Sequence, residues 1–478
     1  MSDPVNTDLH YLTATDALAL FRSRELSPVE LLDAVIERAA KTEPVINAHC
    51  EELFDEAREA ARASEARYLG RGEPPRALEG IPVATKEKHA IAGRPSTDAA
   101  VPFADRMATE SAAVVERVQA AGGIIHARTT TPEFCIAFST YTPLYGVTRN
   151  PWQLDCTPGG SSGGAGASLA AGSTILATGS DIGGSTRVPA SFNGVVGFKA
   201  PYGRVPGTPP NNLDYYRGDG PMARTIEDTV LFQNVLAGPD FRDHSSVVPK
   251  LTLPTELGDV AGMRIALSIT LGDYPVEASV RENTMAVAEA LRAGGATVEE
   301  VALPWKYEEI TRTWITHISH TLGPNLRHVA DQHGDQLADY TLAMAEQTRR
   351  HSATPFGEAM QAETTLQREL AETMEGFDAL ICPTMGLTEY PADRTVFEPL
   401  LVDGHPVEPH FSAFLTHPFN LANRCPVLAV PSGHAPNGVP TGVQIVGHPY
   451  QDEAVFRVGK ALQIGRPWAF TTDHQPKL

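Results

Sequence analysis

Two adjacent serines in a glycine-rich loop are the first residues whose types and spacing could do chemistry. The segment reads Thr157-Pro-Gly-Gly-Ser161-Ser-Gly-Gly-Ala-Gly166 and stands directly before a predicted helix of small residues. Backbone N–H groups and a helix N-terminus that point to one place favour negative charge, so phosphate is one candidate ligand. A nucleotide P-loop, however, ends in Gly-Lys-Ser/Thr, and Ala165 stands at that position here. A noncatalytic phosphate or nucleotide binder built on the 159–166 loop is therefore the weaker hypothesis.

The same loop also fits the Gly-x-Ser-x-Gly nucleophile elbow, centred on Ser161 or on Ser162. An elbow enzyme needs an acid and a histidine as partners of its serine. The downstream histidines stand in ordinary sequence contexts, and we expect them to be surface or core residues: His405, His410, His417, His434 and His448.

A second serine lies where a predicted apolar strand runs into two glycines. This segment reads Gly179-Ser-Asp-Ile-Gly-Gly-Ser185-Thr-Arg-Val-Pro189. Consecutive N–H groups of Ile182, Gly183, Gly184 and Ser185 could form an oxyanion hole around a carbonyl group that Ser185 attacks. The purely structural alternative is a tight turn between a strand and a helix.

Lys86 is the candidate base, because a serine hydroxyl is a poor nucleophile until another group accepts its proton. It ends a predicted strand and precedes Glu87. A lysine with an ordinary pKa near 10.4 is almost entirely protonated at pH 7. Burial and hydrogen bonds to serines would lower the pKa of Lys86. The structural alternative is a solvated surface lysine.

Taken together, these segments resemble the amidase signature family. Lys86 ends Leu78-Glu-Gly-Ile-Pro-Val-Ala-Thr-Lys86, and the intervals of 75 residues to Ser161 and of a further 24 to Ser185 are similar to those of the family. Three other segments also match: Tyr145-Gly-Val-Thr-Arg-Asn-Pro-Trp152, Gly194-Val-Val-Gly-Phe-Lys-Ala-Pro-Tyr-Gly-Arg204 and Pro440-Thr-Gly-Val-Gln-Ile-Val-Gly447.

The resemblance implies a Ser-cisSer-Lys triad that needs no cofactor. Ser185 is the implied nucleophile, Ser161 is the bridging serine in a cis peptide, and neutral Lys86 is the base. The implied oxyanion and substrate-binding groups are Ile182, Gly183, Gly184 and the carbonyl of Cys135, and the implied supporting residues are Ser162, Asp181 and Arg187. Cys135 stands where the family more often has glycine, which adds bulk near the acyl pocket. Thr186 also departs from the family pattern, because a branched aliphatic residue is common at its position.

The resemblance implies an α/β fold, a single large domain with a central mixed β-sheet flanked by helices on both sides. The local patterns agree, because the strand 81–86, the helix 110–121 and the apolar 124–125 predict a βαβ unit. Within one domain over 1–478 we expect four parts: N-terminal helices in 1–75, a signature core in 76–240, a variable helical substrate region in 250–400, and a C-terminal return to the core in 401–478. The variable part is expected to contain an edge-like strand at 264–268 and helices near 278–295, 308–350 and 354–376.

Composition restricts the partners. The 478 residues carry a net charge of -20, and no run of lysines or arginines supplies a basic patch. Such a balance repels nucleic acids and anionic membranes, and it argues against a tRNA-dependent partner complex. The odd number of cysteines, five, without a CxxC pair is typical of free thiols in a reducing compartment. We expect a cytoplasmic protein that acts on small molecules, with a homodimer left open. His317 and His320 lack further metal ligands nearby in the sequence, so no metal site is predicted.

The expected function is hydrolysis of amide bonds, in small aliphatic or aryl amides, through a serine acyl-enzyme. Two alternatives use the same triad: a carbamate or ester hydrolase, and a glutamyl-tRNA amidotransferase of the A type. Specificity in the family lies in variable helices, here 308–376, and in loops such as 140–144 and 202–216. Four aromatic residues in these segments suggest an apolar pocket: Tyr141, Tyr215, Tyr216 and Trp314.

Overall fold

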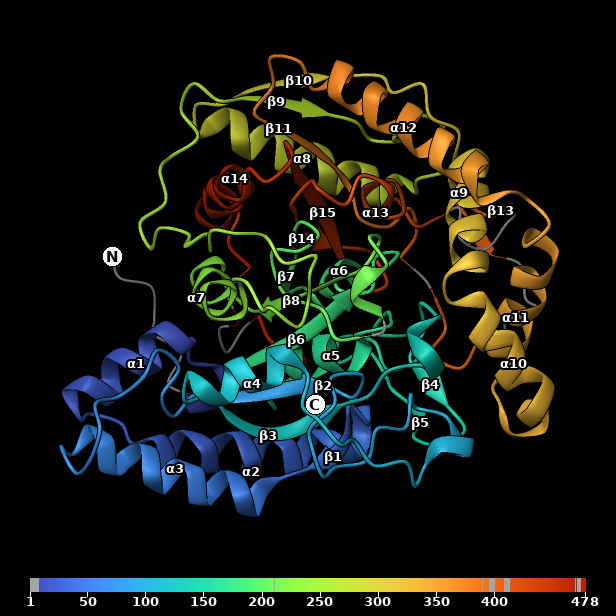
Figure 1. Cartoon of the computed structure of the whole chain (residues 1–478). Coiled ribbons are helices and arrows are strands. Elements are labelled where there is room, and N and C mark those ends of the chain that lie inside the picture. The colour runs from blue at the N-terminus through green and yellow to red at the C-terminus, as the bar shows by residue number, and fades with distance from the viewer. Residues whose placement is uncertain are drawn as a thin grey trace.

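A mixed sheet of eleven strands runs through the centre of the protein (Figure 1). The computed structural model describes residues 8–209, 211–388, 390–394, 400–407, 413–468, 470 and 474–478. Within these residues, the strand order is β1-β3-β2-β6-β8-β7-β14-β15-β11-β9-β10. Neighbours are parallel from β3 through β2 to β6 and from β11 through β9 to β10, and the remaining neighbours are antiparallel.

The strands have these bounds: β1 His49–Glu52, β2 Pro82–Lys86, β3 Ile124–Thr129, β4 Tyr141–Thr142, β5 Gly146–Val147, β6 Leu176–Asp181, β7 Val196–Lys199, β8 Gly218–Ala223, β9 Arg264–Leu267, β10 Thr297–Glu300, β11 Ala379–Pro383, β12 Leu400–Val402, β13 His405–Val407, β14 Val427–His434 and β15 Pro440–Gly447. The α-helices have these bounds: α1 Ala14–Ser23, α2 Pro28–Ile46, α3 Phe54–Tyr68, α4 Ala113–Ala120, α5 Gly163–Ala171, α6 Arg187–Asn193, α7 Ile226–Leu236, α8 Ala278–Ala293, α9 Tyr307–His320, α10 Gly323–His333, α11 Asp339–His351, α12 Phe356–Thr373, α13 Pro418–Leu421 and α14 Asp452–Gly465.

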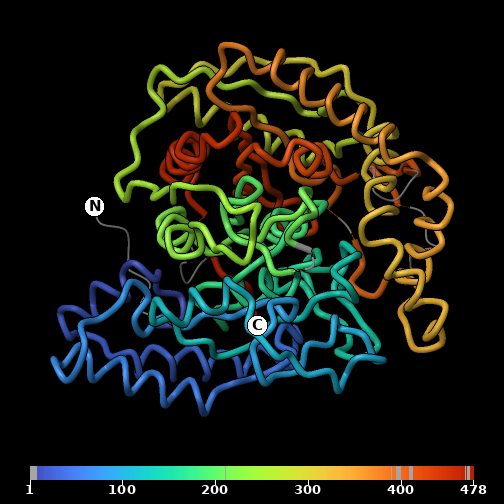
Figure 2. The backbone as a smooth tube through the Cα atoms, viewed as in Figure 1, coloured from blue at the N-terminus to red at the C-terminus, as the bar shows by residue number. Residues whose placement is uncertain are grey.

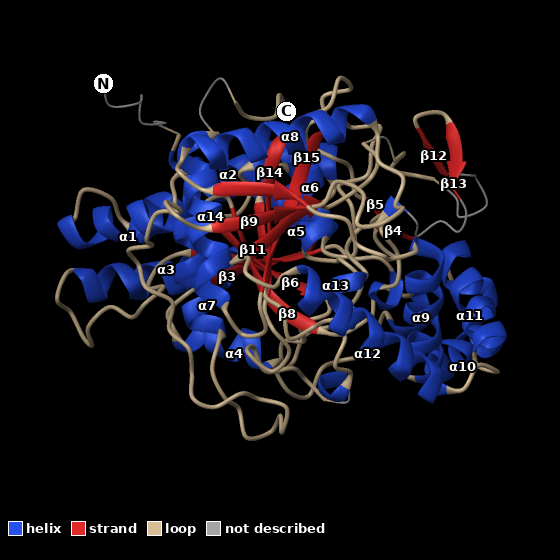
Figure 3. Ribbon diagram, turned by 90° about the horizontal axis from the view of Figure 1, so that it is seen from above, coloured by secondary structure: helices blue, strands red, loops and turns tan. Residues whose placement is uncertain are grey.

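Helices cover both faces of the sheet (Figure 3). Helices α2, α5 and α6 lie on one face, and α4, α7, α8 and α14 lie on the other, where α8 packs against α14. Helices α9, α10 and α11 pack on one another at one side of the molecule, away from the centre of the sheet (Figure 1). The predicted fold class, one large α/β domain with a mixed sheet between helices, is thereby confirmed.

The chain returns to its own middle at its end, which brings distant segments together. Strand β14 pairs with β7, so that Leu428 lies opposite Phe198. Figure 2 shows this return, since the red C-terminal tube runs beside the green middle of the chain. The sheet therefore joins the segment after the second serine to residues more than two hundred positions later.

The local predictions hold at β2, α4 and β3, which form the expected βαβ unit with parallel strands. The strand expected near 264–268 is present as β9, but its predicted edge position is wrong. Strand β9 lies between β11 and β10, and β10 forms the edge of the sheet. The helix expected over 308–350 is three helices, α9, α10 and α11. The breaks fall beside Gly323-Pro324, where proline takes an early helical position, and at the 3-10 turn Gly334–Gln336.

Candidate active site

Lys86, the last residue of β2, lies buried in a cluster of serine hydroxyls. Its Nζ donates hydrogen bonds of 2.7 Å to Ser161 Oγ, 2.9 Å to Ser162 Oγ and 3.0 Å to Ser180 Oγ. An ammonium group has three protons to donate, and here each is directed to a neutral oxygen. Burial lowers the pKa of Lys86 from 10.5 to about 8. Roughly a tenth of this lysine is therefore neutral at pH 7, far more than in solution.

The loop that carries Ser161 packs so closely against the 137–138 backbone that position 160 must be glycine. The Gly160–Ser161 peptide bond is cis, as the resemblance implies. A Cβ atom on Gly160 would lie 2.7 Å from the carbonyl oxygen of Ala137, a distance that real side chains do not adopt. The N–H of Ser162 donates to the carbonyl oxygen of Ser185 at 3.1 Å, which ties this loop to the second serine segment.

The turn after β6 presents Ser185 at the start of α6. Gly184 has a φ of +126°, and a Cβ atom there would collide with Thr416 Oγ1, so only glycine fits. The N–H of Gly184 donates to Asp181 Oδ1 at 2.8 Å, and the N–H of Thr186 donates to Asp181 Oδ2 at 3.2 Å. Of the four predicted oxyanion donors, Gly184 is thus engaged by the protein itself. The N–H groups of Ile182, Gly183 and Ser185 remain as candidates.

Asp181 and Arg187 form a fully buried ion pair behind this turn. Two parallel hydrogen bonds of 2.9 and 2.8 Å join the guanidinium group to the carboxylate. The guanidinium also donates to Thr416 O at 2.9 Å, to Asn420 Oδ1 at 2.7 Å and to Gln444 Oε1 at 2.6 Å. Burial alone would raise the pKa of Asp181, but the charge and hydrogen bonds of Arg187 hold that pKa well below its usual range. The arrangement fits the predicted bracing role.

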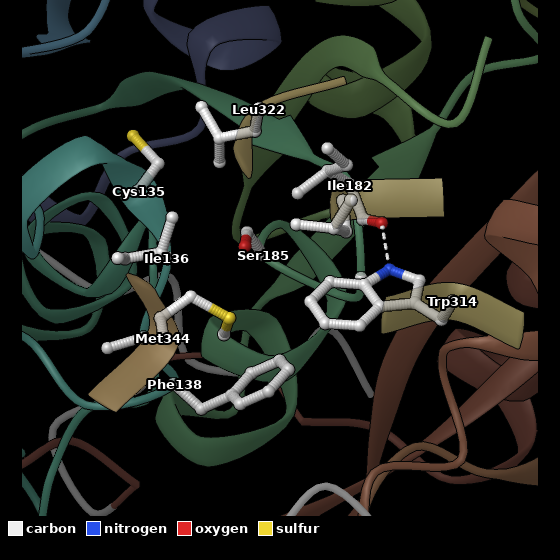
Figure 4. Close-up of a pocket in the computed structure, with 11 residues that line it drawn as sticks. Cys135, Ile136, Phe138, Ile182, Ser185, Trp314, Leu322 and Met344 are labelled. Carbon is white, nitrogen blue, oxygen red and sulfur yellow. Dashed lines mark hydrogen bonds between the residues drawn. The ribbon is translucent and has the colours of Figure 1, made fainter. Parts of the chain in front are cut away.

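Ser185 lies at the wall of an apolar pocket (Figure 4). The space, about 340 Å³ with its open mouth, is bounded by the 135–138 segment, the 182–185 turn and helices of the variable region. Its lining residues are Cys135, Ile136, Ala137, Phe138, Ile182, Gly183, Ser185, Trp314, Ile318, Leu322 and Met344. No lining side chain carries a charge, so the pocket suits an uncharged, apolar group. Cys135 is one of these residues and adopts a φ of +59°, a left-handed region that favours glycine.

The variable helices supply the far wall of this pocket, in agreement with the sequence. Trp314 and Ile318 come from α9, Leu322 follows α9, and Met344 lies on α11. No described residue of 140–144 or 202–216 lines this pocket, so the expected role of these two loops in specificity stays a prediction.

The aromatic residues of those loops make polar contacts elsewhere. Tyr141 donates its hydroxyl to Asp339, and Tyr215 and Tyr216 donate theirs to Glu363. Of the four aromatic residues that the sequence singled out, Trp314 is the one that reaches the pocket.

Among the histidines named above, His417 packs next to the 182–185 turn. Its ring stacks on Trp314, with ring centroids 4.6 Å apart, and a Cβ atom on Gly183 would lie 3.2 Å from it. Burial lowers the pKa of His417 to about 3, so the ring is neutral. His405 and His434 are exposed, His448 contacts the carbonyl of Phe377, and His410 lies outside the described residues.

The two histidines of α9 do not form a shared site. His317 Nε2 lies 2.8 Å from Asp214 Oδ1, whereas His320 Nε2 lies 2.8 Å from the carbonyl oxygen of Thr354. Among the described residues, no group of three or more His, Cys, Asp or Glu side chains is placed to hold a metal ion. None of the described helices has both the length and the apolar character needed to cross a bilayer.

Two contacts of this site carry no clear signal in the sequence. Ser180, the third hydroxyl on Lys86, sits on β6, where an isolated serine carries no signal of its own. Its position could have been inferred only from the parallel pairing of β2 with β6. The side chain of Thr416, which donates to the carbonyl of Gly183, comes from a segment without a recognisable motif.

The sequence profile of the family described as Amidase matches residues 30–456, and the chain belongs to this family. It is 33% identical over 473 residues to an acylamidase of Rhodococcus erythropolis, covering 97% of each chain. It is 32% identical over 494 positions to the A-type subunit of the glutamyl-tRNA(Gln) amidotransferase of Chloroflexus aggregans, covering 97% of this chain and 98% of that protein. A solved bacterial aryl acylamidase of the amidase signature enzymes superposes with a TM-score of 0.89 at 28% identity, covering 96% of this chain and 97% of that one.

Proposed function

We propose that this chain hydrolyses amides whose acyl or amine group is apolar, aryl groups included, through a serine acyl-enzyme. The observation that carries the proposal is the buried Lys86 with its serine partners next to Ser185, at the wall of a pocket without charged side chains. In this proposal Ser185 is the nucleophile, Ser161 is the bridging serine and Lys86 is the base. The similarity to an acylamidase and to an aryl acylamidase supports the substrate class.

In the first half-reaction, neutral Lys86 accepts a proton from Ser161 while Ser161 accepts one from Ser185. The Ser185 oxygen adds to the amide carbon, and the carbonyl oxygen becomes an oxyanion held by backbone N–H groups of the turn. When the tetrahedral adduct collapses, the carbon–nitrogen bond breaks. Ser161 passes its proton to the leaving nitrogen and takes one back from the lysine, so the relay ends as it began and an ester on Ser185 remains.

In the second half-reaction, water enters from the pocket and loses a proton to Ser161 as its oxygen attacks the ester carbon. Lys86 again accepts the proton that Ser161 gives up. Collapse breaks the bond between the acyl carbon and the Ser185 oxygen, which recovers its proton through Ser161. The products are a carboxylic acid and an amine, and the enzyme returns to its starting state.

The pocket argues for an uncharged amide over glutamine as substrate. Glutamine carries an α-carboxylate and an α-ammonium group, and burying either without a partner is costly. No lining residue of the pocket offers such a partner. The net charge of -20 likewise argues against a tRNA complex. The similarity to the glutamyl-tRNA(Gln) amidotransferase nevertheless makes glutamine hydrolysis the second candidate.

The test compares substrates on the isolated enzyme. We expect release of the aniline from 4-nitroacetanilide and no release of ammonia from glutamine, and we expect a fluorophosphonate to label Ser185, as read by peptide mass spectrometry. Matched ester and carbamate substrates with the same aryl group rank the alternative bonds. Hydrolysis of glutamine alone would favour the amidotransferase role. An unlabelled and inert protein would favour the phosphate binder.

The rate is expected to rise with pH, because the reactive form of Lys86 is the neutral one. Since the pKa of Lys86 is about 8, kcat/KM for a neutral amide should increase close to tenfold per pH unit below about 7 and level off above 8 to 9. The measurement is a pH–rate profile between pH 5.5 and 9.5 with a non-ionising anilide. A profile that is flat or falls between pH 6 and 8 would contradict the role of a lysine base.

A further inference from the structure

Trp314 reaches from helix α9 in the variable region to the backbone of the 182–185 turn. Its indole Nε1 donates a hydrogen bond of 2.9 Å to the carbonyl oxygen of Ile182, drawn as a dashed line in Figure 4. Its ring also forms part of the pocket wall beside Ser185. We propose that Trp314 is a positioning residue for amide hydrolysis, which aims the N–H of Gly183 at the substrate oxygen. The proposal rests on the proposed function.

The geometry of one peptide unit links the indole to the oxyanion donor. A trans peptide points its carbonyl oxygen and its N–H in opposite directions, and the peptide bonds of this turn are trans. The Ile182 carbonyl and the Gly183 N–H belong to one such unit. When the indole holds the carbonyl oxygen on its own side, the N–H must point away from the indole nitrogen. Gly183 has no side chain that could fix this plane by packing.

The next two peptide units have hydrogen bonds of the same kind. The carbonyl of Gly183 accepts from the hydroxyl of Thr416, and on the other side of that unit the Gly184 N–H donates to Asp181. The carbonyl of Gly184 accepts from the N–H of Val188 at 2.7 Å, in the first turn of α6. Three successive planes are thus fixed by their carbonyl oxygens. The first of them depends on a side chain of the variable region.

Trp314 is itself held in place by the elements around it. The ring is 5% exposed and stacks on His417. One turn further along α9, His317 contacts Asp214 Oδ1 at 2.8 Å, and its ring stacks on Tyr216 with centroids 3.6 Å apart. Helix α9 is therefore anchored one turn away from the indole, which keeps the indole nitrogen at the Ile182 carbonyl.

The same anchor leads back to the ion pair behind the turn. Asn420 donates to the carbonyl of Tyr216 at 3.1 Å and to Asp181 Oδ1 at 2.9 Å. The turn is thus joined to α9 in two places, directly through Trp314 and indirectly through Asn420 and Tyr216. These two connections hold the turn in place, as is required if the Gly183 N–H is to keep one orientation during the reaction.

A pocket wall and a positioning residue predict different kinetics. A residue that only shapes the wall changes the binding of substrate and transition state alike, which shifts KM and leaves kcat. A residue that aims an oxyanion donor acts where charge develops in the transition state, which lowers kcat and weakens tetrahedral analogues by a similar factor.

The test replaces Trp314 by phenylalanine, which keeps an aromatic ring in the pocket and removes the indole N–H. A second variant carries 3-benzothienylalanine at position 314, introduced by nonsense suppression, and keeps the bicyclic shape without the donor. We expect kcat for 4-nitroacetanilide to fall about 10- to 30-fold in both, with KM within about threefold. The affinity for an aryl trifluoromethyl ketone, which forms an oxyanion on Ser185, should fall by a similar factor.

The matched control is Trp468→Phe. Its indole donates a 3.0 Å hydrogen bond to the carbonyl oxygen of Arg224, away from the pocket, so the same bond is lost without an effect on the turn. We expect wild-type kcat in this control. An active wild type whose Trp314 variants keep kcat and ketone affinity, or change KM alone, would overturn the inference by itself. A wild type that hydrolyses no amide would overturn the proposed function and this inference with it.

Discussion

Replacing Lys86 by methionine or Ser185 by alanine should each lower kcat for an aryl amide by at least about 10⁴-fold. Methionine fills the space of the lysine stem without accepting a proton, and alanine removes the attacking oxygen. Members of a catalytic unit that act together cost nearly the full rate enhancement when one is removed. The measurement is single-substrate kinetics with 4-nitroacetanilide, accompanied by circular dichroism and melting temperature to establish that the fold persists.

The control for this loss is a chemically identical change elsewhere. Lys41 on α2 is exposed and pairs with Glu37, one turn away on the same helix, so Lys41→Met should leave kcat within about twofold of the wild type. Full activity in Lys86→Met would exclude the lysine as base. Full activity in Ser185→Ala would exclude the acyl-enzyme.

Asp181→Ala is expected to lower the free energy of unfolding by about 3–5 kcal/mol. The change leaves the Arg187 guanidinium buried and without its charge partner, which is far more costly than the loss of a surface pair. It also removes the acceptor of the Gly184 and Thr186 N–H groups, so activity should fall together with stability. The measurement is urea unfolding followed by tryptophan fluorescence, with amide hydrolysis assayed on the same preparation.

Asp33→Ala offers the comparison at the surface. Its carboxylate lies 3.2 Å from Arg58 Nε and is about half exposed. Water and salt screen such a pair, so this variant should stay within about 1 kcal/mol of the wild type and keep its activity. Equal losses in Asp33→Ala and Asp181→Ala would argue against a special role of the buried pair.

Much of the site could be predicted because its signals are local. Lys86 ends a strand, and Ser161 and Ser185 stand among glycines that leave the backbone bare, features that adjacent residues alone reveal. In the structure, Lys86 Nζ lies 2.7 Å from Ser161 Oγ, although 75 residues separate the two in the sequence. The roles of nucleophile, relay and base stay predictions until the kinetics are measured. The division of the chain into four parts also stays a prediction.

The features that escaped prediction depend on contacts between distant segments. Helix α9 has the pattern of any amphipathic helix, and nothing local indicates that Trp314 meets the carbonyl of Ile182. The position of β9 inside the sheet was missed for the same reason, since β10 pairs beside it after an intervening helix. Pairing order is a property of the whole sheet, whereas strand content is a property of a few residues.

The close approach of Gly160 to the carbonyl oxygen of Ala137 gives the two walls of the pocket different freedom to evolve. The 135–138 wall lies against the backbone at Gly160, so a change of its shape would also disturb the position of Ser161. The wall formed by Ile318, Leu322 and Met344 belongs to another layer of the molecule. New substrates could therefore be acquired by changes in α9 to α11 other than at Trp314, while Lys86 and Ser161 keep their positions. Directed evolution of substrate range should accordingly collect its mutations in these helices and spare the 135–138 segment.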